Sequence, residues 1–371
     1  MKSLKLNLIL SFIVLLFVFS CKKEGPVDSG GNGNCEPIVP PAGVWKPLGL
    51  GGKLVSELVL YKNFLYACAG RDGLYRLNLC SENSQWEYLG LADTSIERTL
   101  ESGVTDVLSV SGHLLVSYVD GYQHSKQGVY RSTDNGLTWL PSDSGMITTP
   151  EYPMPSQVLD LEVSPVDSRI ILAGTSVSLV YLSSNGGLLW QQITGTVGAS
   201  AFNHIIRFNS SRANEVWVGG ETGRFAPYLL HSMDLGLNWR NISFPPNIGP
   251  YTYDNAVYDI AIDPTNDSIL YFGMLGVITK TTDKGETFQR ILGWKDGIYR
   301  YWRLAINPSN PQELLATGFY LYRTTDGGKS WQRITPPDNR NELYALAVDW
   351  QQRVLFVSAF SPGNGIYKLR F

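Results

Sequence analysis

An eight-residue pattern occurs five times in this 371-residue chain and limits the fold more than any other feature. Each copy has the form Ser/Thr-x-Asp/Asn-x-Gly-x-x-Trp/Phe, and successive copies are 43 to 51 residues apart. Glycine in this pattern supplies a backbone φ above zero, and the Asp side chain accepts hydrogen bonds from backbone N–H groups of a turn. The pattern therefore predicts a hairpin turn, followed by a strand that opens with the aromatic residue. The defining residues are Asp134, Gly136, Trp139, Asn185, Gly187, Trp190, Asp234, Gly236, Trp239, Asp283, Gly285, Phe288, Asp326, Gly328 and Trp331.

Two further series of residues set the number of repeats at seven. The position two residues before each turn is held by Tyr130, Tyr181, Leu230, Thr279 and Tyr322, and similar neighbours surround Tyr75 and Tyr367. The aromatic residue after the turn occurs only six times, since Trp86 adds one copy to the five above. The missing copy is Trp45, because Val44–Leu48 is similar to Ser330–Ile334. A repeat divided between the two ends of the folded chain predicts a closed ring.

A third series marks one strand of each repeat by apolar alternation with period two, followed in most copies by a polar residue and Pro. Its clearest copies are Val158–Val163, Val257–Ile262, Trp302–Ile306 and Leu343–Val348. The predicted fold is all-β: a single seven-bladed β-propeller over residues 43–371, closed by an N-terminal strand that completes the last blade. Trp45 is expected to be largely buried against the blade that contains Tyr367.

The repeated turn resembles the Asp-box of the BNR-repeat family. The order of strands and turns resembles seven-bladed propellers of the sortilin, photosystem II assembly factor and xyloglucanase types over nearly the whole folded part. This resemblance implies that the boxes lie on the outer rim and that partners meet the face built by the loops between blades and between second and third strands. Candidate residues on that face are Tyr122, His124, Glu221, Arg224, Tyr253, Trp294, Asp296, Arg300 and Trp302.

Aromatic rings beside carboxylates and arginines suit two kinds of ligand. Sugar C–H faces stack on the rings while the hydroxyls pair with polar groups. Protein partners also use Tyr, Trp and Arg at the centre of an interface. The alternative is that these residues pack between blades.

The first residues predict export. Lys2 and Lys5 precede an apolar run from Leu8 to Phe19, and Val18–Cys21 resembles a lipobox. Residues 1–20 are then a lipoprotein signal peptide, Cys21 is the lipidated residue, and residues 21–42 form a flexible tether. An ordinary secretory signal is the alternative. We expect a propeller in the cell envelope that touches the membrane through its lipid anchor only.

The remaining cysteines and the acidic residues predict no metal site and no cofactor. In an oxidising compartment one of Cys35, Cys68 and Cys80 stays unpaired. Cys68 lies in an apolar run, so we expect a disulfide between Cys35 and Cys80. Calcium is an alternative suggested by the box acids, but these belong to separate repeats. No Cys/His spacing indicates zinc.

The sequence favours a recognition or scaffold module, monomeric and non-catalytic, that binds a glycan or protein. A formal charge of −3 gives no reason to expect nucleic acid. No Phe/Tyr-Arg-Ile-Pro motif of sialidases is present, although Arg207, Arg224, Arg300 and Arg303 are candidates for an arginine cluster. Asp72 lies near the place of a xyloglucanase catalytic Asp, but out of register, and is interpreted as a turn residue. A sialidase-like or xyloglucanase-like glycoside hydrolase remains the alternative.

Overall fold

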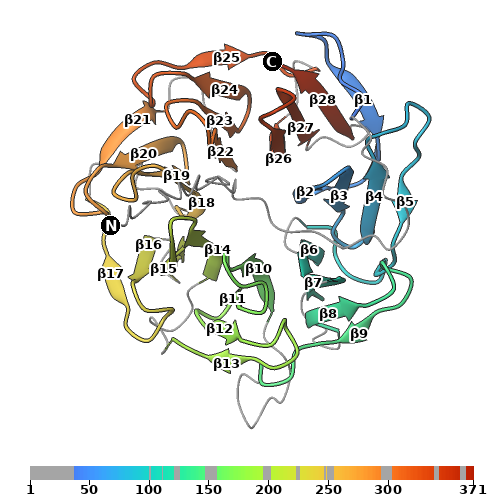
Figure 1. Cartoon of the computed structure of the whole chain (residues 1–371), viewed down its shortest axis with the longest axis horizontal. Helices are drawn as coiled ribbons and strands as arrows, with labels where there is room; N and C mark the ends of the chain where they lie inside the picture. The colour runs from blue at the N-terminus through green and yellow to red at the C-terminus, as the bar shows by residue number, and fades with distance from the viewer. Residues whose placement is uncertain are drawn as a thin grey trace, which may run out of the picture.

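A computed structural model describes residues 37–99, 102–110, 112–120, 126–146, 157–194, 202–222, 226–245, 248, 255–293, 303–337, 342–359 and 365–371. This part of the chain forms seven four-stranded antiparallel sheets arranged in a ring, as Figure 1 shows. It contains no helix, and therefore none that is long and apolar enough to cross a membrane. The predicted all-β, seven-bladed propeller is confirmed.

Six blades take their four strands from one continuous stretch of chain, ordered from the axis to the rim. Blade 1 contains β2 (Glu57–Tyr61), β3 (Phe64–Cys68), β4 (Leu74–Asn78) and β5 (Glu87–Tyr88). Blade 2 contains β6 (Gly103–Val110), β7 (His113–Val119), β8 (Gly128–Ser132) and β9 (Leu140–Pro141). Blade 3 contains β10 (Val158–Val163), β11 (Ile171–Thr175), β12 (Val180–Ser183) and β13 (Gln191–Gln192).

The next three blades follow the same plan. Blade 4 contains β14 (Phe202–Asn209), β15 (Arg212–Glu221), β16 (Pro227–Ser232) and β17 (Arg240–Ile242). Blade 5 contains β18 (Val257–Ile262), β19 (Leu270–Met274), β20 (Val277–Thr281) and β21 (Gln289–Gly293). Blade 6 contains β22 (Leu304–Ile306), β23 (Leu314–Thr317), β24 (Leu321–Thr324) and β25 (Gln332–Ile334).

Blade 7 is built from both ends of the described chain. It contains β26 (Leu343–Asp349), β27 (Val354–Ala359), β28 (Ile366–Arg370) and, at the rim, β1 (Lys46–Gly49). The antiparallel register pairs Lys46 with Lys368 and Pro47 with Tyr367. The predicted closure of the ring by an N-terminal strand is therefore confirmed.

The expected packing of Trp45 is confirmed in part. The side chain lies against the cluster that contains Tyr367, and it is partly buried there. Its indole N–H donates to the Thr335 carbonyl, at the end of blade 6, over 2.9 Å. β28 and β1 come from opposite ends of the described chain, so no Asp-box turn joins these two strands. The indole of Trp45 therefore lacks the cover that such a turn would give.

The core lies between the blades. Aliphatic and aromatic side chains of neighbouring sheets pack together, and the seam between the first and last blades is packed in the same way, by Leu58 and Leu65 against Ala345 and Phe356. Apolar residues suit these positions because inner strands are covered on both faces. Each blade alone would expose its faces, so the ring stabilises them together.

The five Asp-boxes are turns between the third and fourth strands. In blade 2, Asp134 Oδ1 accepts hydrogen bonds from Ser132 Oγ (2.7 Å) and from the Thr138 N–H (2.9 Å). Gly136 has a φ of 92°. Hydrogen bonds from Thr138 and Ser132 hold the pKa of the Asp134 carboxyl at about 2. The box carboxylates are therefore saturated by their own turns.

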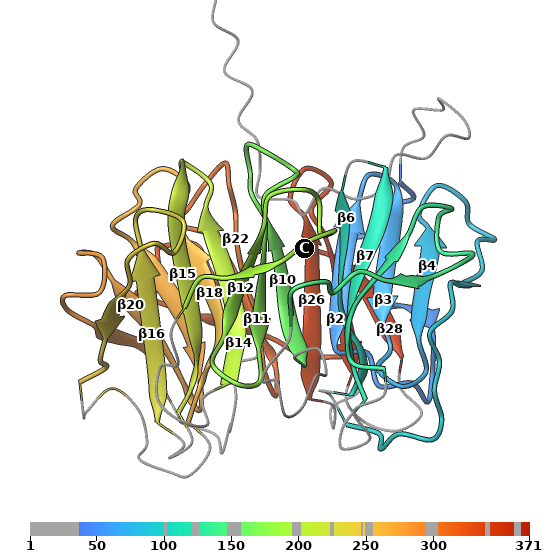
Figure 2. The same cartoon turned by 90° about the horizontal axis from the view of Figure 1, so that it is seen from below.

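The antiparallel order gives the ring two different faces, seen from the side in Figure 2. The Asp-boxes and the turns between first and second strands share one face, which we call the box face. Contacts confirm this arrangement, since the Gly186 N–H donates to the Arg169 carbonyl and the Gly327 N–H donates to the Gln312 carbonyl. The loops between blades and between second and third strands share the opposite face, which we call the loop face.

Cys68 is buried and lies outside any disulfide, and Cys80 is disulfide-bonded. The predicted partner Cys35 lies outside the described residues, so the pairing with Cys35 stays a prediction. Close to Cys80, the Ile38 N–H donates to the Leu79 carbonyl over 3.0 Å. The signal peptide, Cys21 and most of the tether also lie outside the described residues.

Candidate functional site

Of the nine candidate residues on the loop face, the structure describes only Glu221. The other eight, Tyr122, His124, Arg224, Tyr253, Trp294, Asp296, Arg300 and Trp302, lie outside the described residues. Glu221 ends β15, and its Oε1 lies 3.8 Å from His204 Nε2. Both side chains are mostly buried near the start of β14. Glu221 is therefore held by a neighbouring inner strand.

Arg207, on the inner strand of blade 4, connects three blades near the ring axis. Its Nη2 donates to Asp259 Oδ1 of blade 5 over 3.0 Å. Its Nη1 lies 3.5 Å from Asp160 Oδ2 and 3.7 Å from Glu162 Oε2, both of blade 3. Burial alone would lower the pKa of the Arg207 guanidinium, but the Asp259, Asp160 and Glu162 carboxylates outweigh burial and raise it. Arg207 stays charged at any ordinary pH.

Arg303 makes a second arginine contact at the axis. It precedes β22 of blade 6, and its Nε and Nη2 donate to Glu57 Oε2 of blade 1 over 2.9 and 2.7 Å. Blade 7 lies between these two blades, so the pair crosses the inner end of blade 7, where the Arg303 guanidinium lies 5.7 Å from the centre of the Tyr344 ring. Burial lowers the pKa of Arg303, but the Glu57 carboxylate and its other neighbours raise it above the usual range.

These side chains form one axial cluster, which we define as Glu57, Asp160, Glu162, Arg207, Asp259 and Arg303. All belong to inner strands except Arg303, which immediately precedes one. With every group ionised the cluster carries two positive and four negative charges, a net charge of −2. The side chains of the cluster are mostly buried, and charged groups that are mostly buried are retained only when they are paired. The cluster therefore joins the inner strands of blades 1, 3, 4, 5 and 6.

The first residues of the inner strands add aromatic rings at the loop-face end of the axis. The Tyr258 and Tyr344 side chains pack with Ala256 and Leu275 in one small buried cluster. The His204 ring lies 5.7 Å from the Tyr258 ring, centre to centre. Rings and charges therefore meet at the loop-face end of the inner strands of blades 4, 5 and 7.

In three blades, an aspartate of the inner strand accepts a hydrogen bond from a backbone N–H of the next blade. Asp106 Oδ2 accepts from the Leu161 N–H, Asp160 Oδ2 from the Ile206 N–H, and Asp259 Oδ2 from the Leu304 N–H, all over 2.8 or 2.9 Å. The ladder register shifts next to each of these aspartates. The bulge points the carboxylate at the neighbouring blade.

Sequence reasoning missed these aspartates, Glu57 and both tyrosines. A signal for the aspartates exists, because Val-x-Asp-aliphatic occurs at the same place in Val104–Val107, Val158–Leu161 and Val257–Ile260. Arg207 and Arg303 were predicted as candidates for an arginine cluster. Both lie at the axis, but each is bound to its own carboxylates. Arg224 and Arg300 lie outside the described residues.

Asp72 lies in the turn between β3 and β4, on the loop face. Its carboxylate is 3.2 Å from Arg98 Nη2 and 3.7 Å from Lys53 Nζ. The backbone N–H of Asp72 donates to the Ala69 carbonyl. These contacts are those of a turn residue held by two cations.

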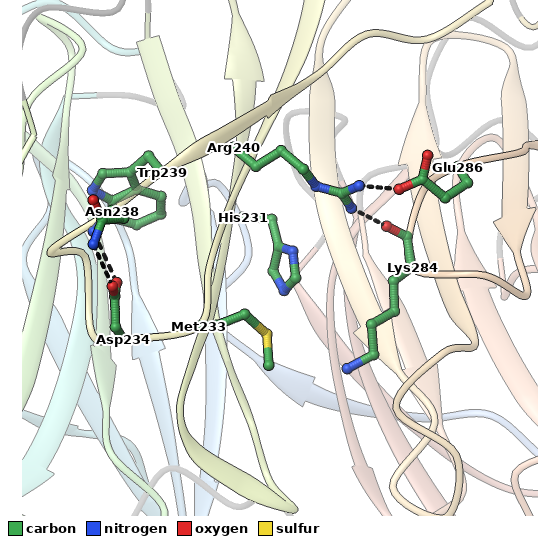
Figure 3. A pocket seen from close by; sticks show the side chains of 8 residues that line it. All are labelled: His231, Met233, Asp234, Asn238, Trp239, Arg240, Lys284 and Glu286. Carbon is green, nitrogen blue, oxygen red and sulfur yellow. Dashed lines mark hydrogen bonds and ion pairs between the residues drawn. The ribbon is translucent and has the colours of Figure 1, made fainter.

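A cavity of about 510 Å³ lies away from the axis, on the rim between blades 4 and 5. Figure 3 shows its lining, with the Arg240 guanidinium directed at the Glu286 carboxylate and the Lys284 carbonyl. Lys284 Nζ reaches past the cavity to the buried Glu215 carboxylate over 3.2 Å. The cations of this cavity are therefore engaged in joining two blades.

No group of three His, Cys, Asp or Glu side chains within the described ranges is placed to hold a metal ion. The axial carboxylates bind guanidinium groups and backbone N–H groups instead. The described residues at this end of the axis therefore form a buried aromatic cluster beside rigidly held ion pairs.

Comparison with known proteins supports the fold and leaves the role open. No protein-family profile matches the chain. A xyloglucanase of Hypocrea jecorina is 22% identical over 383 residues, covering 87% of this chain and 44% of the relative. A xyloglucanase of Paenibacillus is 23% identical over 336 residues, covering 78% and 32%. The chain thus spans less than half the length of the curated relatives it matches.

Solved structures agree with the assignment as a seven-bladed β-propeller. The GH74 xyloglucanase of Xanthomonas campestris superposes with a TM-score of 0.61 and 21% identity, covering 88% of this chain and 53% of that one. YCF48 of Cyanidioschyzon merolae superposes with a TM-score of 0.63 and 17% identity, covering 88% and 98%. YCF48 bound to D1 peptide has a TM-score of 0.62 and 13% identity, covering 91% and 100%. At these identities the likeness concerns the fold.

Proposed function

We propose that this chain is a non-catalytic recognition or scaffold propeller of the cell envelope, which binds a protein or glycan partner on its loop face. The observation that carries the proposal is the pairing of the axial carboxylates. Glycoside hydrolysis needs one carboxyl group as a proton donor and a second as a base or nucleophile. At the axis, Glu57, Asp160, Glu162 and Asp259 are all engaged in ion pairs with Arg207 or Arg303.

The lengths of the similar proteins favour the same conclusion. The chain matches about half of a xyloglucanase but the whole of the YCF48 structure that carries a bound peptide. A single ring that binds a polypeptide segment is therefore the nearer architectural precedent. Rigidly held charged side chains at the axis suit such a segment, because little side-chain entropy is lost on binding.

A glycoside hydrolase is the second candidate. It is favoured by one observation, the sequence similarity to xyloglucanases over 77 to 87% of this chain. The catalytic pair would then involve loop-face residues outside the described ranges.

A paired experiment separates these two candidates. The purified chain is applied to glycan and peptide arrays and incubated with a panel of fluorogenic glycosides and xyloglucan. We expect binding on one array and no turnover. Turnover at any substrate above that of heat-inactivated protein would replace the first candidate with the second.

Variants at the axis show whether binding uses the loop face. Arg303→Gln leaves Glu57 without its cation, so the double variant Arg303→Gln/Glu57→Gln is measured beside it as a folded control. Loss of a charged anchor from an interface centre is expected to weaken partner binding by about 30-fold or more in both. Arg169→Gln, an exposed arginine on the box face, leaves binding unchanged. Unchanged binding in the double variant would remove the axis from the site.

A further inference from the structure

The sixth position of the Asp-box is exposed in all five boxes, but its chemistry changes around the ring. Blades 2, 3 and 4 carry Leu137, Leu188 and Leu237 there, and the first and last of these side chains are about 80% exposed. Blades 5 and 6 carry Glu286 and Lys329 at the same position. The apolar residues are therefore confined to three consecutive blades.

Neighbouring box positions extend this apolar surface. Leu140, Leu189 and Met233 are also exposed, in the same three blades. We define the apolar arc as Leu137, Leu140, Leu188, Leu189, Met233 and Leu237. Val166, in the inner turn of blade 3 on the same face, is 70% exposed. Single exposed apolar side chains are ordinary, but these recur at matching places in three consecutive blades, and such a grouping on one face is a candidate interaction surface.

The turn itself does not require leucine at this position. The box of blade 5 contains Glu286, yet its Thr287 N–H donates to Asp283 Oδ1 over 2.8 Å. The box of blade 6 contains Lys329, and its Ser330 N–H donates to Asp326 Oδ1 over 2.9 Å. The same bond in blade 2 measures 2.9 Å. Since charged residues support the same geometry, the turn itself does not explain the leucines.

The chain joins the propeller on this same face. The Gly43 N–H donates to the Arg370 carbonyl at the box-face end of β28, and the Ile38 N–H donates to Leu79, just after β4. Fifteen residues, 22–36, separate Cys21 from the first described residue. At about 3.3 to 3.6 Å per residue they span at most about 54 Å. An anchor at Cys21 therefore keeps the box-face end of blade 7 within about 54 Å of the bilayer.

We propose that the apolar arc rests on the lipid surface of the membrane that carries the chain, so that the box face is turned toward the bilayer and the loop face away from it. This inference rests on the anchoring part of the proposed function. One lipid anchor and one apolar surface reinforce each other, because the anchor confines the surface near the lipid. The arrangement leaves the loop face free to meet its partner.

The test places one fluorophore at matched box positions. Ser184 in blade 3 and Thr325 in blade 6 are both exposed at the second box position. The variants Ser184→Cys and Thr325→Cys are labelled and reconstituted, with the lipid anchor intact, into phosphatidylethanolamine–phosphatidylglycerol vesicles. Because Cys68 is buried, the unmodified protein serves as the labelling blank. Acyl-chain-brominated lipid is expected to quench the Ser184→Cys label at least about threefold more than the Thr325→Cys label.

A control variant and two further outcomes decide the test. Adding Leu137→Ser, Leu188→Ser and Leu237→Ser together should abolish the difference between the two labels while partner binding on the loop face is retained. Equal quenching at both positions, or none at either, overturns the proposal. A Ser184→Cys signal that changes with protein concentration in the absence of lipid would assign the arc to a second copy of the chain. Intact partner binding in either case leaves the recognition function standing.

Discussion

At the scale of single residues, two buried glutamates organise the contact between blades on the box side. Glu215 accepts from Asn209 (2.7 Å) and His231 (2.9 Å), and also pairs with Lys284 of blade 5. Glu313 binds Asn307, Arg323 and Arg353 in the same manner, joining blade 6 to blade 7. In each case an Asn at the end of the inner strand lies six residues before the Glu. The sequence contains this spacing, but only the ring brings the cations of the next blade to it.

These glutamates predict the acid stability of the protein. Burial raises the pKa of each carboxyl group, but hydrogen bonds from His231 and Asn209 at Glu215, and from Arg353 and Asn307 at Glu313, lower it to about 2. A folded-state pKa below the ordinary value of 4.5 contributes stability that is fully present above about pH 4.5 and is lost as the pH falls toward 2. The shift corresponds to about 3 kcal/mol for each residue.

Urea unfolding measured from pH 7 to pH 2 should therefore show the free energy of unfolding decreasing below about pH 4.5. Glu215→Gln should lower it by about 3 to 5 kcal/mol at pH 7, because Lys284 and His231 lose their buried partner, and should flatten its pH dependence. Glu286→Gln, which removes an exposed carboxylate from the same seam, is the matched control and should cost under about 1 kcal/mol. A pH profile of Glu215→Gln identical to that of the unmodified protein would contradict this account.

At the scale of elements, the aromatic residue that opens the outer strand connects successive blades. The Trp86, Trp139 and Trp190 indoles donate to backbone carbonyls of the preceding blade at Leu48, Leu89 and Ser142 over 2.7 or 2.8 Å. Blades 5 and 6 depart from this rule. Phe288 has no N–H and packs its ring against Phe244 and Phe272, and the buried Trp331 indole N–H has no hydrogen-bond partner among the described residues. The box thus sets both the turn and the contact with the previous blade.

Two tryptophans at the same position differ in burial and should differ in energy. Trp190 is almost fully buried, and Trp190→Ala is expected to lower the free energy of unfolding by about 3 to 5 kcal/mol. Trp45→Ala is expected to cost about half as much, since Trp45 is only partly buried at the seam that closes the ring. Thermal unfolding of both variants provides the measurement. A larger loss for Trp45→Ala would show that the closing strand limits the stability of the ring.

At the scale of the whole molecule, the ring separates two surfaces for which we propose different roles. The axial arginines and tyrosines lie toward the loop face. The tether joins the propeller at the box face, which also carries the apolar arc. A module that is held at a membrane and meets a partner needs such a division. Glu57 and Arg303 are 246 residues apart in the chain, and their contact exists only because the ring is closed.

Anchoring is tested on the full chain expressed in a Gram-negative host. Cys21→Ser should move the protein from the membrane fraction to the soluble fraction, because a cysteine thiol is needed for the lipid. Labelled palmitate should enter the unmodified protein and not the variant. Cys68→Ser controls for the loss of a cysteine, because Cys68 is buried and lies outside any disulfide. This variant should leave the distribution between the membrane and soluble fractions unchanged. A membrane-bound Cys21→Ser protein would place the attachment elsewhere.

The sequence by itself determined the number of blades, the position of each turn and the strand that closes the ring. Those features depend on local requirements, such as the positive φ of Gly136 and the alternation of Val158–Val163, and local requirements recur visibly in every repeat. The tertiary structure alone decided which charged groups meet at the axis and how far Trp45 is covered. Arg207 binds carboxylates of blades 3 and 5, and Arg303 binds blade 1 across blade 7. The two arginines leave no periodic trace in the chain, because each binds carboxylates at different positions of different repeats, and these ion pairs form only when the ring sets the distances between blades.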